Sequence, residues 1–134
     1  MYTFPFNFFR YSKTAVIGTL ILVLCLLPSS EFNQLQMPIT FADSIVHFIM
    51  FFAFSGALYL DLTRQKKITL NTLFLFLIVF GVSFFLAALT EILQSVFVPL
   101  HREGSFSDLG FDVLGTIAGF FTIRAIKRKF RPGL

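Results

Sequence analysis

The sequence predicts an all-α integral membrane protein, a bundle of four transmembrane helices with both the N and C termini in the cytoplasm. Three observations predict it: an apolar composition, four long apolar segments, and basic residues that gather on one side of these segments. Hydrophobic residues make up 56% of the 134 residues and charged residues only 13%, with a mean hydropathy of +0.82. A soluble chain of this size would leave roughly a third of its unfolded surface exposed. The polar residues to cover that surface are missing, which excludes soluble enzymes and cytosolic binding modules.

Four segments are predicted to cross the bilayer as a single domain over residues 1–134. A helical span needs about 20 apolar residues, with a range of roughly 17 to 25. The expected spans are residues 11–29, 43–60, 70–97 and 107–125. The third is long enough alone, whereas the others reach this length only with flanking residues.

The first segment has an alternative interpretation as a cleaved signal peptide, because Arg10 and Lys13 precede its apolar run. A cleavage site would need small residues after that run, but Leu26, Leu27 and Pro28 stand there. We therefore expect the first segment to be retained as a helix.

The basic residues predict the orientation. All of the 11 Lys and Arg residues except Arg102 flank the spans on the same side. They are Arg10, Lys13, Arg64, Lys66, Lys67, Arg124, Lys127, Arg128, Lys129 and Arg131. By the positive-inside rule, both termini and the 61–69 loop are expected in the cytoplasm.

Ionisable side chains from three spans are predicted to meet at the outer face. Asp43 and Asp108 begin spans two and four, and His47 and Asp112 each follow one helical turn later, about 6 Å deeper. Glu91 lies at the outer end of span three. Because residues four apart share a helix face, each of the two pairs lies on one side of its helix.

Span four continues this stripe with two glycines, Gly115 and Gly119. A Gly-x-x-x-Gly element lets another helix approach closely. Asp108 and Asp112 are therefore expected to face a neighbouring helix, and the glycine face also offers a contact for an oligomer.

Each polar residue has a structural explanation when taken alone. Asp43 and Asp108 could cap spans two and four, and an isolated His47 is more often a hydrogen-bonding partner between helices than a catalyst. Glu91 and Asp112 differ, because a charge in the bilayer costs about 2.5–3.5 kcal/mol at mid-helix and by default marks a functional site. Glu91, Asp112 and His47 are therefore the candidate catalytic acid/base group.

Four more residues are candidates for binding a substrate: Arg102, Gln94, Asp43 and Asp108. The planar, permanently charged guanidinium of Arg102 suits a phosphate or carboxylate. Crowded carboxylates favour protonation of one member or recruitment of a cation. No metal-ligand spacing is recognised and Cys25 is the only cysteine, so no metal site is assigned. A divalent cation held by oxygen ligands and His47 is an alternative that we do not favour.

Three short motifs, in the same order along the chain, resemble the VanZ-like family of bacterial membrane proteins. Residues 43–48 (DSIVHF) resemble its Asp-Lys-x-x-His-Phe element. Residues 90–94 (TEILQ), followed by Pro99 and Arg102, resemble its Glu-x-x-Gln segment and its loop with Pro and Arg. Residues 108–119 resemble its Asp-x-x-x-Asp-x-x-x-Asn-x-x-Gly ending.

Two positions depart from the family pattern: Ser44 stands where Lys is usual, and Thr116 where Asn is usual. The resemblance implies a multi-pass protein of the bacterial cytoplasmic membrane, related to one that gives low-level resistance to the glycopeptide teicoplanin. It supplies no reaction, because the biochemical activity of the family is not established.

Two functions from different classes follow as hypotheses. In the first, the outer cluster binds or modifies a cell-envelope component, such as a lipid headgroup, a lipid-linked glycan or a glycopeptide antibiotic. In the second, the chain is a non-catalytic scaffold or assembly subunit whose polar cluster holds the helices together. Transport is less well supported, because the ionisable residues do not continue toward the inner side. No nucleic-acid motif is found, so nucleic acid is not an expected partner.

Overall fold

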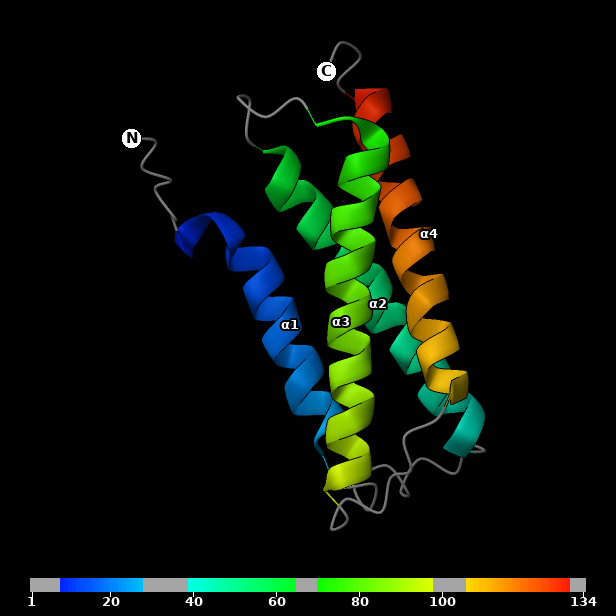
Figure 1. Cartoon of the computed structure of the whole chain (residues 1–134). Coiled ribbons are helices and arrows are strands. Elements are labelled where there is room, and N and C mark those ends of the chain that lie inside the picture. Colours follow the sequence, from blue (N-terminus) through cyan, green and yellow to red (C-terminus); the bar gives the residue numbers. More distant parts are fainter. Residues whose placement is uncertain (1–7, 28–38, 65–69, 98–105, 131–134) are drawn as a thin grey trace.

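A computed structural model describes residues 8–27, 39–64, 70–97 and 106–130, and these residues form helices joined without any strand. A short 3-10 helix, η1 (Phe8–Tyr11), leads into α1 (Ser12–Cys25). Three longer helices follow: α2 (Ile39–Thr63), α3 (Thr72–Val96) and α4 (Phe106–Phe130). The predicted all-α architecture is confirmed for these residues (Figure 1).

Three of the helices are long and apolar enough to cross a membrane. The stretches that could cross are Asp43–Thr63, Thr72–Val96 and Phe106–Phe130. A helix of 25 residues, such as α3, is about 38 Å long and exceeds the roughly 30 Å hydrocarbon core of a bilayer. Helix α1 is also apolar but has only 14 residues.

The ends of the helices differ from those of the predicted spans at several places, by about one helical turn. Helix α2 begins at Ile39, four residues before the predicted start at 43, so Asp43 lies inside the helix and does not cap it. Helix α1 ends at Cys25 rather than at 29. Helix α4 runs to Phe130 rather than to 125, because its basic end stays helical.

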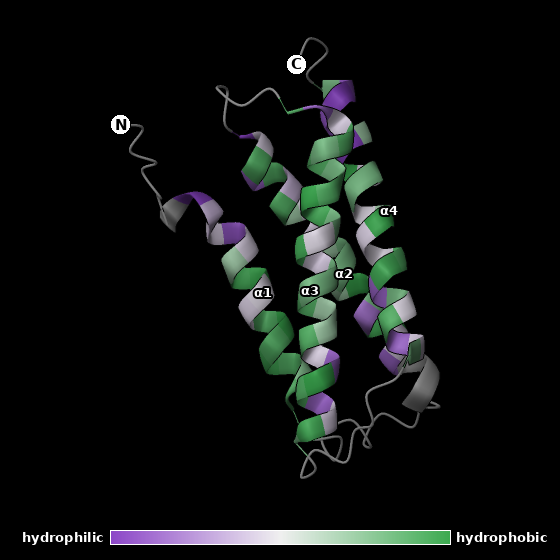
Figure 2. Ribbon diagram, viewed as in Figure 1, coloured by the Kyte–Doolittle hydropathy of each residue, from purple (hydrophilic) through white to green (hydrophobic). Residues whose placement is uncertain are grey.

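Successive helices run in opposite directions, so α2 and α4 are parallel to each other (Figure 1). The start of α1 and the end of α4 lie at one end of the bundle, together with the end of α2 and the start of α3. We call it the basic end, because the described Lys and Arg side chains belong to this part of the bundle. They are Arg10, Lys13, Arg64, Arg124, Lys127, Arg128 and Lys129. Figure 2 shows polar residues at both ends of the bundle and a mostly hydrophobic middle.

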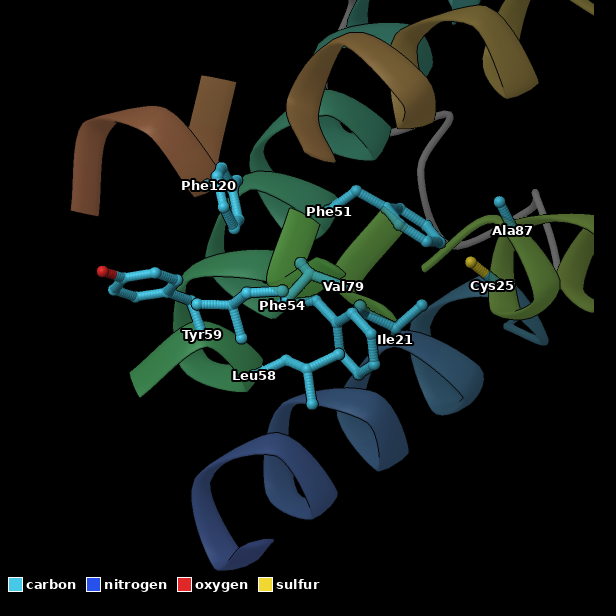
Figure 3. Packing of buried hydrophobic residues seen from close by; sticks show 10 residues of the cluster. Ile21, Cys25, Phe51, Phe54, Leu58, Tyr59, Val79, Ala87 and Phe120 are labelled. Atoms are coloured by element: carbon cyan, nitrogen blue, oxygen red, sulfur yellow. The ribbon is translucent and has the colours of Figure 1, made fainter. Parts of the chain in front are cut away.

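The centre of the bundle is a hydrophobic core to which all four α-helices contribute (Figure 3). Ile21 of α1, Phe51 of α2, Val79 of α3 and Phe120 of α4 are each at most 1% exposed. The ring of Phe120 meets that of Tyr59 edge-on, with 5.3 Å between the ring centroids. Large apolar side chains also cover the outside, as expected where a helix faces lipid.

The closest packing joins α2 and α4 along the predicted glycine stripe. A Cβ atom added at Gly115 would collide with the backbone of Phe48, and one at Gly119 with the carbonyl oxygen of Phe52. Both glycines are buried. The Gly115/Gly119 face is therefore covered by α2 of the same chain.

Helix α1 is held by side chains of other helices at both of its ends. The carboxylate oxygen Oδ2 of Asp61 on α2 accepts hydrogen bonds from the Thr14 backbone N–H at 3.0 Å and from its hydroxyl at 2.8 Å. At the other end, Nε2 of Gln94 on α3 donates to the carbonyl oxygen of Cys25 at 3.1 Å. Backbone groups at helix ends have no partner within the helix, so these contacts both satisfy the ends of α1 and attach it to the bundle.

Replacing Asp61 by alanine is expected to loosen α1. The substitution removes the acceptor of both Thr14 hydrogen bonds, a loss of about 1–3 kcal/mol. Cys25, the single cysteine, is buried, so its accessibility to a thiol reagent measures how firmly α1 is held. Its maleimide labelling in detergent should rise on the order of tenfold in Asp61→Ala. Asp61→Asn keeps an acceptor oxygen and should give a smaller rise. Equal labelling of Asp61→Ala and a Lys13→Ala control would contradict this role for Asp61.

Candidate functional site

A buried histidine–aspartate pair joins α2 to α4 at the end opposite the basic end. Nδ1 of His47 lies 3.0 Å from Oδ1 of Asp112. The two residues are only 1% and 0% exposed. When Asp112 is ionised its carboxylate can only accept, and the Nδ1–H of His47 then donates this hydrogen bond. The predicted approach of these two residues is thus present in the structure.

A second contact joins α2 to α4 about one turn nearer the start of each helix. The hydroxyl of Ser44 donates to Oδ1 of Asp108 at 2.8 Å, and both residues are buried. The Ser44–Asp108 and His47–Asp112 contacts lie on the same face of α4 as Gly115 and Gly119. The glycine packing explains this register, because it brings the two parallel helices close enough for short side chains to meet.

Helix α3 adds Glu91 to the site. Donor atoms of His47, Glu91 and Asp112 all lie within 4.8 Å of one another. Asp43, His47 and Asp108 form a second group, whose donor atoms also lie within 4.8 Å of one another. His47 belongs to both groups and therefore lies at the centre of the cluster. We call these six residues the polar cluster: Asp43, Ser44, His47, Glu91, Asp108 and Asp112.

The electrostatics of the polar cluster are unbalanced. It contains four carboxyl groups, and His47 is the only one of its members that can carry a positive charge. Among the described residues, the Lys and Arg side chains belong to the basic end instead. In addition, Oδ2 of Asp112 is buried and accepts no hydrogen bond from the described residues. Buried carboxylate oxygens are costly to leave without a donor or a cation.

The remaining predicted site residues are placed as follows. Asp43 and Asp108 lie beside His47 in the second group. Gln94 is 3% exposed and its amide nitrogen holds the end of α1, which gives this predicted substrate-binding residue a structural contact. Arg102, the predicted anion contact, lies outside the described residues.

The sequence did not predict the structural contacts of two residues, Ser44 and Asp61. Ser44 was noted only as a departure from a family pattern, yet it bonds Asp108. Asp61, which is 1% exposed, holds the start of α1. A signal for Asp61 did exist, because it is the only acid on the predicted cytoplasmic side. Nothing in the spacing of Ser44 pointed to Asp108.

An apolar hollow lies on the surface of the bundle between α3 and α4, at the same end as the polar cluster. Phe84 of α3 forms one wall. The other walls come from the first two turns of α4, namely Phe106, Ser107, Leu109, Gly110, Phe111, Val113 and Leu114. The turns that carry Asp108 and Asp112 toward α2 thus present an apolar surface on their other side.

No family model matches the chain, and neither a curated protein nor a solved structure is significantly similar to it. The resemblance to VanZ-like proteins therefore stays a prediction that rests on the short motifs of the sequence.

Proposed function

We propose that the chain is a VanZ-like membrane protein whose polar cluster binds or modifies a cell-envelope component at the outer face of the bacterial cytoplasmic membrane. One observation carries the proposal: three separate helices bring His47, Glu91 and Asp112 within 4.8 Å of one another in a largely buried site. Ionisable groups that face the interior of a membrane bundle are costly and by default mark function.

The proposed orientation is supported by the position of the basic residues. The described Lys and Arg side chains share one end with the start of α1 and the end of α4, and the positive-inside rule assigns such an end to the cytoplasm. The polar cluster then lies toward the outside. We further propose that η1 and α1 together form the fourth span, since 4 and 14 residues give about 29 Å of helix.

The chemical roles follow from the groups that meet. Glu91 or Asp112 exchanges a proton with the ligand, and His47 acts as its partner, because a carboxyl and an imidazole in contact form a general acid/base pair. Arg102 contacts a phosphate or carboxylate of the ligand. The apolar hollow beside Phe84 supports a ligand with a lipid part, such as a lipid headgroup, a lipid-linked glycan or the lipophilic glycopeptide teicoplanin.

The proposal is tested by teicoplanin susceptibility of a sensitive host that expresses the protein or its Glu91→Gln variant. Glutamine keeps the size of the side chain but cannot exchange a proton at the carboxyl. We expect the native chain to protect and Glu91→Gln to lose most of that protection, because loss of an acid/base group typically slows a reaction by about 10²–10⁴-fold. Membrane levels of both proteins are quantified in parallel.

Ser95→Ala is the matched control, because Ser95 lies one turn further along α3, is exposed, and bonds only within its own helix. It should protect like the native chain. Full protection by Glu91→Gln at equal abundance would reject the acid/base role. Absence of protection by the native chain would show that the resistance phenotype does not extend to this member, with Ser44 as the first position to change.

A second candidate function is a non-catalytic scaffold or assembly subunit. It is favoured by the two hydrogen bonds that join α2 to α4, from Ser44 to Asp108 and between His47 and Asp112. Under this function, substitutions at His47 or Asp112 lower the abundance of the protein but not its activity per molecule.

A further inference from the structure

The polar cluster contains the donor set of a transition-metal site. His47 offers an imidazole nitrogen, and Glu91 and Asp112 offer carboxylate oxygens, all within 4.8 Å of one another. Histidine nitrogen together with Asp or Glu oxygen is a common ligand set for Zn²⁺. The sequence could not reveal it by spacing, because each ligand comes from a different helix.

The distances already approach those of a coordinated ion. Nδ1 of His47 and Oδ1 of Asp112 are 3.0 Å apart. Two ligands bound to one tetrahedral Zn²⁺ at about 2.0–2.2 Å lie about 3.4 Å from each other. An ion could therefore replace the hydrogen between these two atoms with little movement of α2 or α4.

A second observation points to a cation rather than to a proton alone. Asp112 is 0% exposed, and its Oδ2 has no hydrogen-bond donor among the described residues. A positive charge nearby would compensate this oxygen, and no described Lys or Arg belongs to this end of the bundle. A divalent cation supplies that charge and binds both carboxylates at once.

We propose that His47, Glu91 and Asp112 bind one divalent transition-metal ion, with Zn²⁺ as the best match to the donors. Three protein ligands leave a coordination position for water or a ligand, as in catalytic zinc sites. The inference deepens the proposed function, since it rests on the same cluster and assigns a cofactor to it. Metal binding is measured on the purified protein, so its failure and a failure of the resistance assay are distinguishable.

The experiment uses the full chain in mild detergent, stripped with a chelator and dialysed against Zn²⁺ or, separately, Mn²⁺. Bound metal is measured by elemental analysis, and Co²⁺ absorption serves as a second readout of the ligand set. We expect about one Zn²⁺ per chain, with affinity at least about tenfold weaker in Glu91→Gln and Asp112→Asn. His47→Gln should also change the Co²⁺ spectrum, because a nitrogen ligand is lost.

Ser95→Ala is the matched control, because Ser95 lies on α3 beyond Glu91, is exposed and bonds only within its own helix. It should bind Zn²⁺ like the native chain. Loss of binding in Asp43→Asn and Asp108→Asn, but not in Glu91→Gln, would overturn the assignment and move the ion to the second group. No bound metal, or binding that no variant changes, would also overturn it. If Glu91→Gln does not fold as judged by gel filtration, Glu91→Asp carries the same test with a shortened carboxylate.

Discussion

Alanine at Gly115 is expected to separate α2 from α4 and to destabilise the protein strongly. The added Cβ would meet the carbonyl oxygen and carbon of Phe48 and the nitrogen of Phe52, all of them backbone atoms that cannot rotate away. Adding a methyl group to tight packing typically costs 1–3 kcal/mol, and occasionally more. We expect the upper part of that range, because α2 itself has to move.

The helix offers its own matched control in Gly110. A Cβ there meets nothing within 4 Å, so Gly110→Ala should keep or slightly raise stability through its better helix propensity. The measurement is the thermal unfolding midpoint in detergent, together with abundance in the membrane. Similar behaviour of Gly115→Ala and Gly110→Ala would show that α2 and α4 do not pack as closely as described.

The same substitution also tests how the fold positions the site. Phe48 follows His47 directly on α2, and Gly115 lies about one turn beyond Asp112 on α4. Any movement that relieves the collision therefore lengthens the 3.0 Å contact between His47 and Asp112. Activity per molecule should fall with stability in Gly115→Ala, whereas Gly81→Ala, whose added Cβ also meets nothing within 4 Å, should retain it.

Much of the fold could be predicted from composition and charge, because a bilayer restricts a chain to few architectures. The apolar segments located the helices, and the small-residue stripe correctly indicated that Asp112 faces another helix. The helix ends were less predictable, because α2 and α4 continue as helices into polar residues. Asp43 lies inside α2 because the helix begins earlier, at Ile39, with a mostly apolar first turn.

Most members of the polar cluster could be predicted, apart from Ser44, but its contacts could not. Helical spacing aligned Asp43 with His47 and Asp108 with Asp112 along their own helices. Which residues meet across helices depends on the register of α2 against α4, and no single-helix pattern contains it. The Ser44–Asp108 contact and the Gln94 contact to α1 both depend on such interhelical registers.

Replacing the His47–Asp112 pair by apolar residues is expected to separate folding from function. Asp112→Val alone leaves a buried imidazole without its partner, and His47→Leu alone leaves a buried carboxylate without one. Removing one partner of a buried ion pair can cost about 3–5 kcal/mol, so both single variants should accumulate poorly. The double variant leaves neither group behind, and buried pairs replaced by apolar side chains are often neutral in stability.

The double variant His47→Leu/Asp112→Val should therefore regain membrane abundance and a thermal midpoint close to that of the native chain. It should nevertheless give no protection against teicoplanin and bind no Zn²⁺, because the acid/base group and two of the three proposed ligands are gone. A scaffold predicts the opposite: protection would recover in proportion to abundance, since apolar side chains hold α2 against α4 equally well. Abundance, unfolding and protection measured on the same four proteins thus distinguish a site that acts on a ligand from one that only joins helices.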